Sequence, residues 1–368
     1  MYEDLKQFKD QYLLKKNRDF KHSWNYVSYI VLKSYIDDYL ITNNKIYFNE
    51  VKNFIDTLIY EENQDYFLKE VNFSYNSVDQ IKMADALFFL YDETKDLKYK
   101  ILLDKFFKQL KNYPRTKENS FWHKDNYPYQ VWLDGLYMLQ PFYAKYLTKF
   151  KNKKDYQDII LQFDNVRKYI YNPHNKLYAH AYDSSKDIFW ADKITGQSKY
   201  PWSRALGWLM MAFVDVKEII NDENITLNLS KYLLELTDNL ISYQDKDGMW
   251  FQIVDHPNYQ DNYLETSGTL MISYAILKAI RLNYLDKKYQ DIALKAFKGT
   301  INKYFRKENE LYYLGGICQG AGLGMHPDLH YMRDGSYHYY TKEEKIIENN
   351  GHGVAPLFMV LNELTLYK

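Results

Sequence analysis

Two aspartates lie where expected loops lead into expected helices. Asp79 stands in the segment NSVDQ and Asp134 in the segment WLDG. Carboxyl groups can give and take protons as general acids and bases, and an arginine fork can bind a carboxylate through two hydrogen bonds. Similar junctions carry aromatic, imidazole and cationic side chains, namely His123, Lys124, Trp132, His180, Arg204 and Trp208. Because several loops deliver the same residue types to one predicted rim, these residues are candidates for a functional site.

Each of these residues also has a structural interpretation. Ser77 and Gln80 fit a capping box around Asp79, and Asp134 could cap a helix as well. Arg204 and Trp208 are four residues apart and could stack across one helical turn. A single histidine is more often a packing residue than a catalyst. The site hypothesis therefore depends on the convergence of the junctions and not on any one residue.

Other chemistries find little support in the sequence. His326 and His330 are four residues apart, but a proline follows the first and the lead-in is rich in glycine, so we expect a loop and no metal site. The segment GAGLG at 320–324 lacks the spacing of a dinucleotide fingerprint. A single cysteine, Cys318, excludes an internal disulfide and thiolate-built metal sites. We expect no metal and no cofactor.

The elements that position these residues are predicted to be helices almost throughout. The predicted helices cover 3–16, 23–41, 46–62, 78–93, 97–112, 130–150, 154–171, 202–219, 225–243, 264–281, 287–306 and 352–366. Helices that are apolar on most faces alternate with amphipathic, lysine-rich ones, which predicts inner and outer rings. Six such pairs of about 60 residues each indicate an all-α, (α/α)6 barrel in a single domain spanning 1–368.

The long connections are expected to gather at one end of that barrel. The segments 113–129, 172–201, 244–263 and 307–350 all lead into predicted inner helices. Long loops on a compact scaffold often carry function. We therefore expect the inner-helix N-termini to form the floor of a cleft.

Composition excludes several classes of partner. The 368 residues carry 48 basic and 48 acidic side chains, so no net positive charge attracts nucleic acid or an anionic membrane. The chain contains 39 tyrosines, which suit half-buried positions such as sugar-binding grooves but also fit a general compositional bias. The first residues lack the pattern of a secretory signal and no apolar stretch is long enough for a membrane span, so we expect a cytoplasmic protein.

Four motifs together resemble family 105 of the glycoside hydrolases, the unsaturated rhamnogalacturonyl hydrolases. They are WLDGLYMLQPF (132–142), ADKITGQSKYPWSRALGWLMMA (191–212), ETSGTLMISYA (265–275), and RDGSYHYY (333–340) with NGHGVAPLFM (350–359). The resemblance implies an (α/α)6 barrel. It also implies removal of a 4,5-unsaturated uronic acid from the non-reducing end of oligosaccharides left by polysaccharide lyases.

The resemblance further implies roles for the candidate residues. Asp134 is the expected general acid/base and Asp79 its carboxylate partner. The reaction would start when Asp134 gives a proton to C4 of the unsaturated sugar. Burial and the charge of Asp79 are expected to keep Asp134 partly protonated. The two carboxyl groups are expected to lie close together and to titrate as a pair. The implied substrate-binding residues are His123, Lys124, Trp132, His180, Arg204 and Trp208.

Three other functions remain open from the sequence. They are an unsaturated glucuronyl hydrolase acting on glycosaminoglycan or ulvan fragments, a barrel-type sugar epimerase or isomerase, and a non-catalytic oligosaccharide-binding barrel. The expected partner is an oligosaccharide substrate with a terminal unsaturated uronate, and the protein is expected to be a monomer or a weak homodimer.

Overall fold

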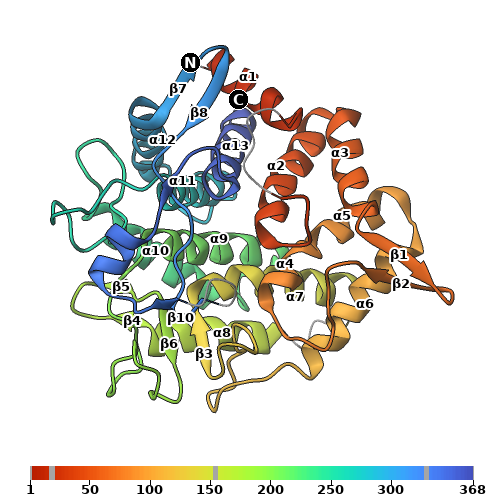
Figure 1. The fold of residues 1–368 in the computed structure, drawn as a ribbon, viewed down its shortest axis with the longest axis horizontal. Coiled ribbons are helices and arrows are strands. Elements are labelled where there is room, and N and C mark those ends of the chain that lie inside the picture. Colours follow the sequence, from red (N-terminus) through yellow and green to blue (C-terminus); the bar gives the residue numbers. More distant parts are fainter. Residues whose placement is uncertain (1, 16–20, 152–155, 327–330, 368) are drawn as a thin grey trace.

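A ring of inner helices lies at the centre of the computed structural model, which describes residues 2–15, 21–151, 156–326 and 331–367. Within these residues the ring consists of α2 (Tyr26–Thr42), α4 (Val78–Met83) with α5 (Asp85–Thr94), α7 (Leu133–Phe150), α9 (Ser203–Ile220), α11 (Thr266–Arg281) and α13 (Gly351–Leu366). Each inner element contacts the next, and α13 contacts α2, so the ring closes (Figure 1). The predicted (α/α)6 barrel is confirmed.

Amphipathic helices cover the outside of this ring. They are α1 (Tyr2–Leu13), α3 (Lys45–Asp56), α6 (Leu97–Lys111), α8 (Tyr156–Tyr169), α10 (Leu227–Ile241) and α12 (Gln290–Tyr304). In α6, for example, Leu103 and Phe106 are buried whereas Lys108 is exposed. One apolar stripe facing the inner ring and a charged opposite face is what an outer helix requires.

The first outer helix is the partner of the last inner helix. The rings of Phe8 in α1 and Phe358 in α13 lie 5.6 Å apart, and Lys9 Nζ donates a hydrogen bond to Asn362 Oδ1 over 2.8 Å. The two ends of the chain consequently lie near one another (Figure 1).

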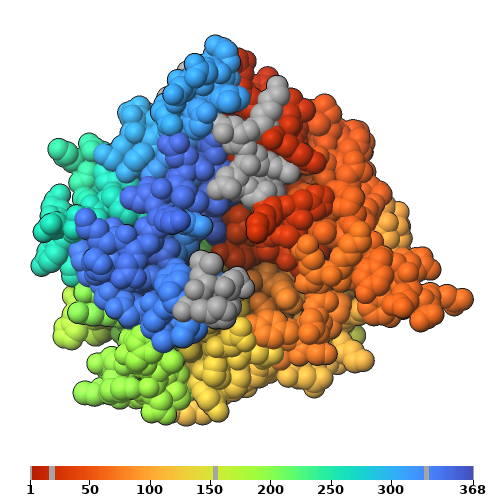
Figure 2. All heavy atoms as spheres, in the orientation of Figure 1, coloured from red at the N-terminus to blue at the C-terminus, as the bar shows by residue number. Residues whose placement is uncertain are grey.

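Short antiparallel strand pairs connect the helices. Within the described residues they are β1 with β2 (Ile59–Glu62, Asp65–Leu68), β3 with β6 (Gln130–Trp132, Ala181–Asp183), β4 with β5 (Tyr171–Asn172, Leu177–Tyr178), β7 with β8 (Phe305–Glu308, Leu311–Leu314), β9 with β12 (Ile317–Cys318, Ile346–Ile347) and β10 with β11 (Gly324–Met325, Met332–Arg333). The β1–β2 hairpin projects from the molecule at one edge (Figures 1 and 2). The other pairs hold loops at the barrel ends.

Several predicted helix boundaries are wrong. The helices predicted for 46–62 and 287–306 end early, because residues 59–62 and 305–308 are the first strands of hairpins. Asn63 and Gln64, with φ of 51° and 63°, form a two-residue turn of the kind that reverses such strands. The helix predicted for 130–150 starts later, at Leu133, because 130–132 form β3. The helix predicted for 78–93 is interrupted at Ala84, whose N–H bonds to the carbonyl of Ile81, three residues earlier.

Among the helices of the described residues, none combines the length and apolar content needed to cross a bilayer.

Candidate active site

Both candidate aspartates lie in the first turns of inner helices. Asp79 is in α4, which begins after Ser77, and Asp134 is in α7, which begins after Trp132. Neither preceding residue caps its helix through a side-chain hydrogen bond, so the capping box considered for Ser77 is wrong. Each carboxyl group is therefore positioned by a junction between a loop and an inner helix, one at the start of α4 and the other at the start of α7.

A loop that precedes α7 brings two further candidates to Asp79. The N–H of Val78 donates to the carbonyl of His123 over 3.2 Å, and Ser77 pairs with Lys124 in an antiparallel bridge. This backbone pairing places Lys124 Nζ 2.5 Å from Asp79 Oδ2 and His123 Nε2 3.8 Å from Asp79 Oδ1. Asp79 thus sits in an ion pair at the side of the site.

The strand pair β3–β6 organises the surroundings of Asp134. The N–H of Leu133 donates to the carbonyl of His180 over 3.1 Å, which fixes the start of α7 against the loop that carries His180. His180 Nε2 then lies 3.4 Å from Asp134 Oδ2, and its other ring nitrogen, Nδ1, is 2.7 Å from the hydroxyl oxygen of Tyr340. His180 is fully buried and absent from the cavity walls, so the substrate-binding role expected for it is corrected to a contact with Asp134.

Stacked rings form a wall beside the carboxylates. The ring centroids of His123 and Trp132 are 4.5 Å apart with planes inclined by 8°, and Tyr127 stacks on the same indole at 4.8 Å. Gly135 leaves room for this arrangement, because a Cβ there would lie 3.1 Å from His123 Nδ1. Such a wall is suited to the flat or apolar face of a sugar.

Arg204 lies at the N-terminus of α9 and is almost fully buried. Its guanidinium donates a hydrogen bond to the carbonyl of Cys318, and its Cζ lies 4.9 Å from the ring centroid of Trp202. Its Nε has no hydrogen-bond partner among the described residues. Stacking on Trp202 replaces the alternative considered from the sequence, in which Arg204 stacks on Trp208.

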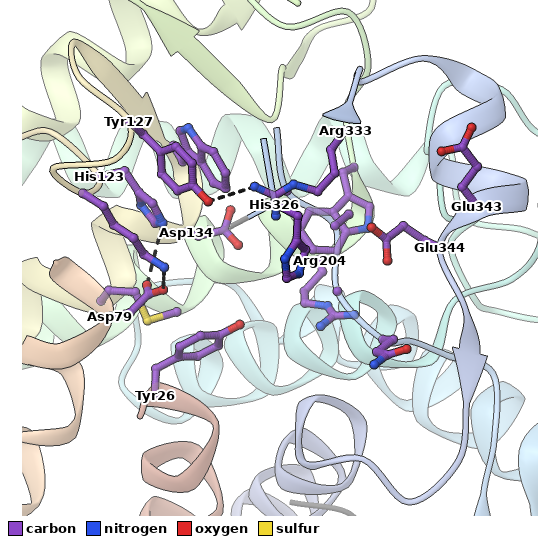
Figure 3. A pocket seen from close by; sticks show the side chains of 18 of the residues that line it. Tyr26, Asp79, His123, Tyr127, Asp134, Arg204, His326, Arg333, Glu343 and Glu344 are labelled. Atoms are coloured by element: carbon purple, nitrogen blue, oxygen red, sulfur yellow. Dashed lines mark hydrogen bonds and ion pairs between the residues drawn. The ribbon is translucent and has the colours of Figure 1, made fainter. Parts of the chain in front are cut away.

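These side chains surround a cavity of about 440 Å³. Its walls are Tyr26, Asp79, His123, Lys124, Tyr127, Trp132, Asp134, Met138, Trp202, Arg204, Gln319, Gly320, Ala321, Gly322, His326, Tyr331, Arg333, Glu343, Glu344 and Lys345. In Figure 3, Asp79 and His123 lie on one side, Arg333 and Glu343 on the other, and Asp134 between them. Figure 2 shows that N-terminal segments, in red and orange, and C-terminal segments, in blue, lie on opposite sides of the middle of the molecular face.

The electrostatics give Asp79 and His123 different charge states. Burial alone would raise the pKa of Asp79, but the charge of Lys124 and the ring of His123 outweigh it and hold that pKa below its ordinary value. Burial lowers the pKa of His123 to about 4, although Asp79 opposes the shift. At neutral pH Asp79 is consequently an anion and His123 an uncharged ring. The predicted coupled titration of Asp79 and Asp134 stays a prediction.

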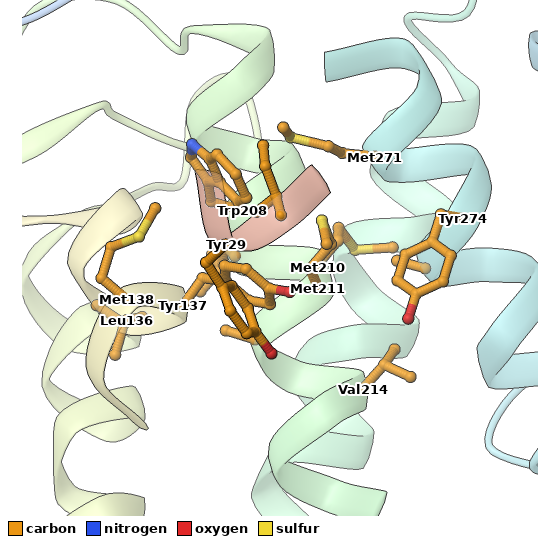
Figure 4. Packing of buried hydrophobic residues seen from close by; sticks show 14 of the residues in the cluster. Tyr29, Leu136, Tyr137, Met138, Trp208, Met210, Met211, Val214, Met271 and Tyr274 are labelled. Atoms are coloured by element: carbon orange, nitrogen blue, oxygen red, sulfur yellow. The ribbon is translucent and has the colours of Figure 1, made fainter. Parts of the chain in front are cut away.

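Trp208 does not reach the cavity. It is 1% exposed and stacks on Tyr137 of α7, with ring centroids 5.1 Å apart, inside the packed inner-helix core (Figure 4). It is absent from the cavity walls. The substrate-binding role expected for Trp208 is therefore corrected to one in core packing.

Replacement of Trp208 tests this correction. We expect Trp208→Ala to lower the free energy of unfolding by about 3–5 kcal/mol, as for other large buried aromatic residues. The milder Trp208→Phe should leave KM unchanged. Urea unfolding and steady-state kinetics check the two effects, and a strongly raised KM in a stably folded Trp208→Phe would return this residue to the site.

Several wall residues were not singled out from the sequence. Tyr26 begins the inner helix α2, so the rule of loop-to-helix junctions could have found it. Arg333 and Glu344 come from the long segment before α13. In that segment the sequence does not indicate which side chains point into the cavity. Arg333 donates to the hydroxyl of Tyr127 over 2.8 Å, which joins this segment to the aromatic wall.

Metal ligation finds no support in the described part of the chain. There, no group of three or more His, Cys, Asp or Glu side chains is arranged to hold an ion. His326 lines the cavity, whereas His330, its considered partner, lies outside the described residues.

Comparison with known proteins decides the family. The family model described as Glycosyl Hydrolase Family 88 matches residues 3–367, nearly the whole chain. The chain belongs to this family. A solved glycoside hydrolase of family 105 from Clostridium acetobutylicum is 35% identical, with a TM-score of 0.91 over 98% of this chain and 99% of the other. The resemblance to family 105 is thereby confirmed, and the chain is a glycoside hydrolase.

Two curated relatives add to the comparison. Protein Atu3128 of Agrobacterium fabrum is 36% identical to this hydrolase over 195 residues, which are 52% of this chain and 82% of the relative. Unsaturated rhamnogalacturonyl hydrolase YesR of Bacillus subtilis is 23% identical over 278 residues, which are 73% of this chain and 75% of the relative.

Proposed function

We propose that this hydrolase removes a 4,5-unsaturated uronic acid from the non-reducing end of oligosaccharides that a lyase has produced from rhamnogalacturonan. The observation that carries the proposal is the setting of Asp134, a carboxyl group on the cavity wall beside Trp132 with one oxygen facing His180. The name of the Bacillus subtilis relative supports the substrate class.

The reaction needs one group that gives a proton and later takes one. The substrate ring contains an enol ether, so a proton delivered by Asp134 to C4 leaves positive charge shared by C5 and the ring oxygen. Water then adds at C5 and loses a proton to the Asp134 carboxylate. The resulting hemiketal opens and releases the rest of the oligosaccharide, so one water is consumed in the whole cycle and Asp134 ends protonated as it began.

Other wall residues complete the proposed site. Asp79, held as an anion by Lys124, stabilises the positive charge that develops on the ring. Arg204 presents its guanidinium to the uronate carboxylate, because it lines the cavity and, although one of its nitrogens binds the Cys318 carbonyl, its Nε has no partner among the described residues. His123, Lys124 and Trp132 contact the sugar, and His180 acts through Asp134.

Ultraviolet absorbance of the conjugated uronate provides the test. On a panel of lyase digests, we expect absorbance to fall fastest with rhamnogalacturonan fragments. A faster fall with glycosaminoglycan or ulvan fragments would assign the chain to the glucuronyl class. Binding without any fall would indicate a binding barrel, and a product of unchanged mass would indicate an isomerase.

Replacement of Asp79 tests its role as an anion. We expect Asp79→Asn to lower kcat/KM at neutral pH by about 10²- to 10³-fold, the usual cost of removing one charge-stabilising group. The acidic limb of the pH–rate profile should move in this variant. We expect protonation of Asp79 to set that limb in the wild type, and asparagine does not titrate. The pH–rate profile measures both effects, and an unmoved acidic limb would refute the assignment.

The same variant has a stability signature with a defined sign. The lowered pKa of Asp79 means that its ion pair contributes fully to stability above the unfolded-state pKa of about 3.9 and loses that contribution as pH falls through the folded value. The stability difference between wild type and Asp79→Asn should therefore shrink in acid. Asp92→Asn, which breaks a more exposed pair with Lys149, is the control and should leave kcat/KM unchanged.

A further inference from the structure

The two oxygens of Asp134 have different surroundings. Oδ2 is buried and lies 3.4 Å from His180 Nε2, and neither atom has a hydrogen-bond partner among the described residues. The side chain as a whole is 15% exposed and contributes to the cavity wall. The exposed part of this carboxyl group is consequently on the side away from His180.

Tyr340 contacts the other ring nitrogen of His180. Tyr340 lies in η3 (Tyr339–Glu343), is fully buried and has its hydroxyl oxygen 2.7 Å from His180 Nδ1. Burial raises the pKa of Tyr340 well above its ordinary value, so the hydroxyl keeps its proton. Among the described residues, that hydroxyl contacts His180 Nδ1. The hydroxyl proton therefore has an acceptor if Nδ1 is not protonated.

The opposite tautomer is disfavoured at both ends of the imidazole. If Nδ1 carried the proton, the Tyr340 hydroxyl would accept and its own proton would have no partner. Nε2 would then present a lone pair to a carboxylate oxygen 3.4 Å away. Unpaired buried donors and facing lone pairs are both costly.

We propose that Tyr340 is a positioning residue that holds His180 in the Nε2–H tautomer, so that the Nε2–H group faces Oδ2 of Asp134 and Oδ1 is the oxygen that carries the catalytic proton. The inference about Oδ1 rests on the proposed function, whereas the tautomer does not. An N–H group facing Oδ2 suits both protonation states of Asp134. Oδ2 is a carboxylate oxygen when Asp134 is ionised and the carbonyl oxygen when Oδ1 carries the proton. No change of tautomer is needed between the two proton steps.

Nitrogen NMR of histidine-labelled full-length protein tests the tautomer without any substrate. We expect the His180 signals, assigned by their absence in His180→Gln, to show a protonated Nε2 and a bare Nδ1 in the wild type. A protonated Nδ1 would overturn the proposal. This result is independent of whether any unsaturated uronide is hydrolysed.

Kinetics of Tyr340→Phe test the positioning role. Loss of a hydrogen bond that orients a functional histidine typically costs about 10- to 100-fold, so we expect kcat to fall by that factor with KM unchanged. Tyr178→Phe is the matched control, because it removes a buried hydroxyl two residues before His180 in the chain that has no hydrogen-bond partner among the described residues. It should change neither kcat nor the tautomer.

A double variant separates positioning from a merely structural effect. In the His180→Gln background, Tyr340→Phe should cause no further fall in kcat, because the group through which the hydroxyl acts is absent. A full additional fall in that background, or an unchanged kcat in Tyr340→Phe alone, would overturn the proposal. If Tyr340→Phe fails to fold, the wild-type tautomer measured by NMR still decides the question.

Discussion

Asp134→Asn should abolish nearly all turnover while substrate binding is largely kept. A positioned general acid or base contributes about 10²- to 10⁴-fold, and we expect a loss at the upper end because one carboxyl group performs both proton steps. Asparagine has nearly the same shape, and its amide can still meet His180 from the wall of the cavity. Ultraviolet kinetics give kcat, and calorimetric titration of the inactive variant with an unsaturated disaccharide gives Kd.

A matched control guards this prediction against a trivial loss of structure. Asp291 also lies in the first turn of a helix, α12, but on the outside of the barrel and exposed. Asp291→Asn should therefore have wild-type kcat, and both variants should melt within a few degrees of the wild type. If Asp134→Asn keeps a tenth or more of the wild-type kcat, another residue supplies the proton.

Arg204→Lys is expected to raise KM strongly and to change kcat much less. A hydrogen bond to a charged group contributes about 1.5–3 kcal/mol, which corresponds to roughly 10- to 150-fold in KM when the paired geometry is lost. Lysine keeps the positive charge but not the planar fork, so it cannot make two parallel hydrogen bonds to a carboxylate from separate nitrogens while it binds the Cys318 carbonyl. Steady-state kinetics on the unsaturated disaccharide provide the measurement.

The control for this variant is a half-buried arginine elsewhere. Arg281 binds Glu363 through two hydrogen bonds, of 2.6 and 3.0 Å, outside the walls of the cavity. Arg281→Lys should lower the free energy of unfolding but leave KM unchanged. Wild-type KM in Arg204→Lys would remove Arg204 from the substrate-binding groups.

The helical part of the fold was open to prediction because its signal is local. The apolar positions of α9 surround the whole helix, whereas those of α6 form one stripe, and this difference alone separates inner from outer helices. Some strands of hairpins were predicted as the ends of helices, as for residues 59–62, which precede the turn at Asn63 and Gln64. A positive φ at two consecutive residues depends on the pairing of the strands that they join, which short-range periodicity does not record.

The candidate site divides in the same way. Residues at the starts of inner helices, such as Asp79, Asp134 and Arg204, could be predicted because a helix start is visible in sequence and the barrel collects these starts at one end. The direction of Trp208 could not be predicted, since one turn along the same helix is enough to move a side chain from the cavity wall into the core.

By itself, the sequence determined the residue types at the helix starts and the alternation of inner and outer helices. Only the tertiary structure decided which side chains meet. Lys124 pairs with Asp79, and the hydroxyl of Tyr340 contacts His180. Arg333 donates a hydrogen bond to Tyr127, which lies 206 residues earlier in the chain. The physical reason is that these contacts depend on the closure of the ring, which brings the start and the end of the chain to opposite walls of one cavity.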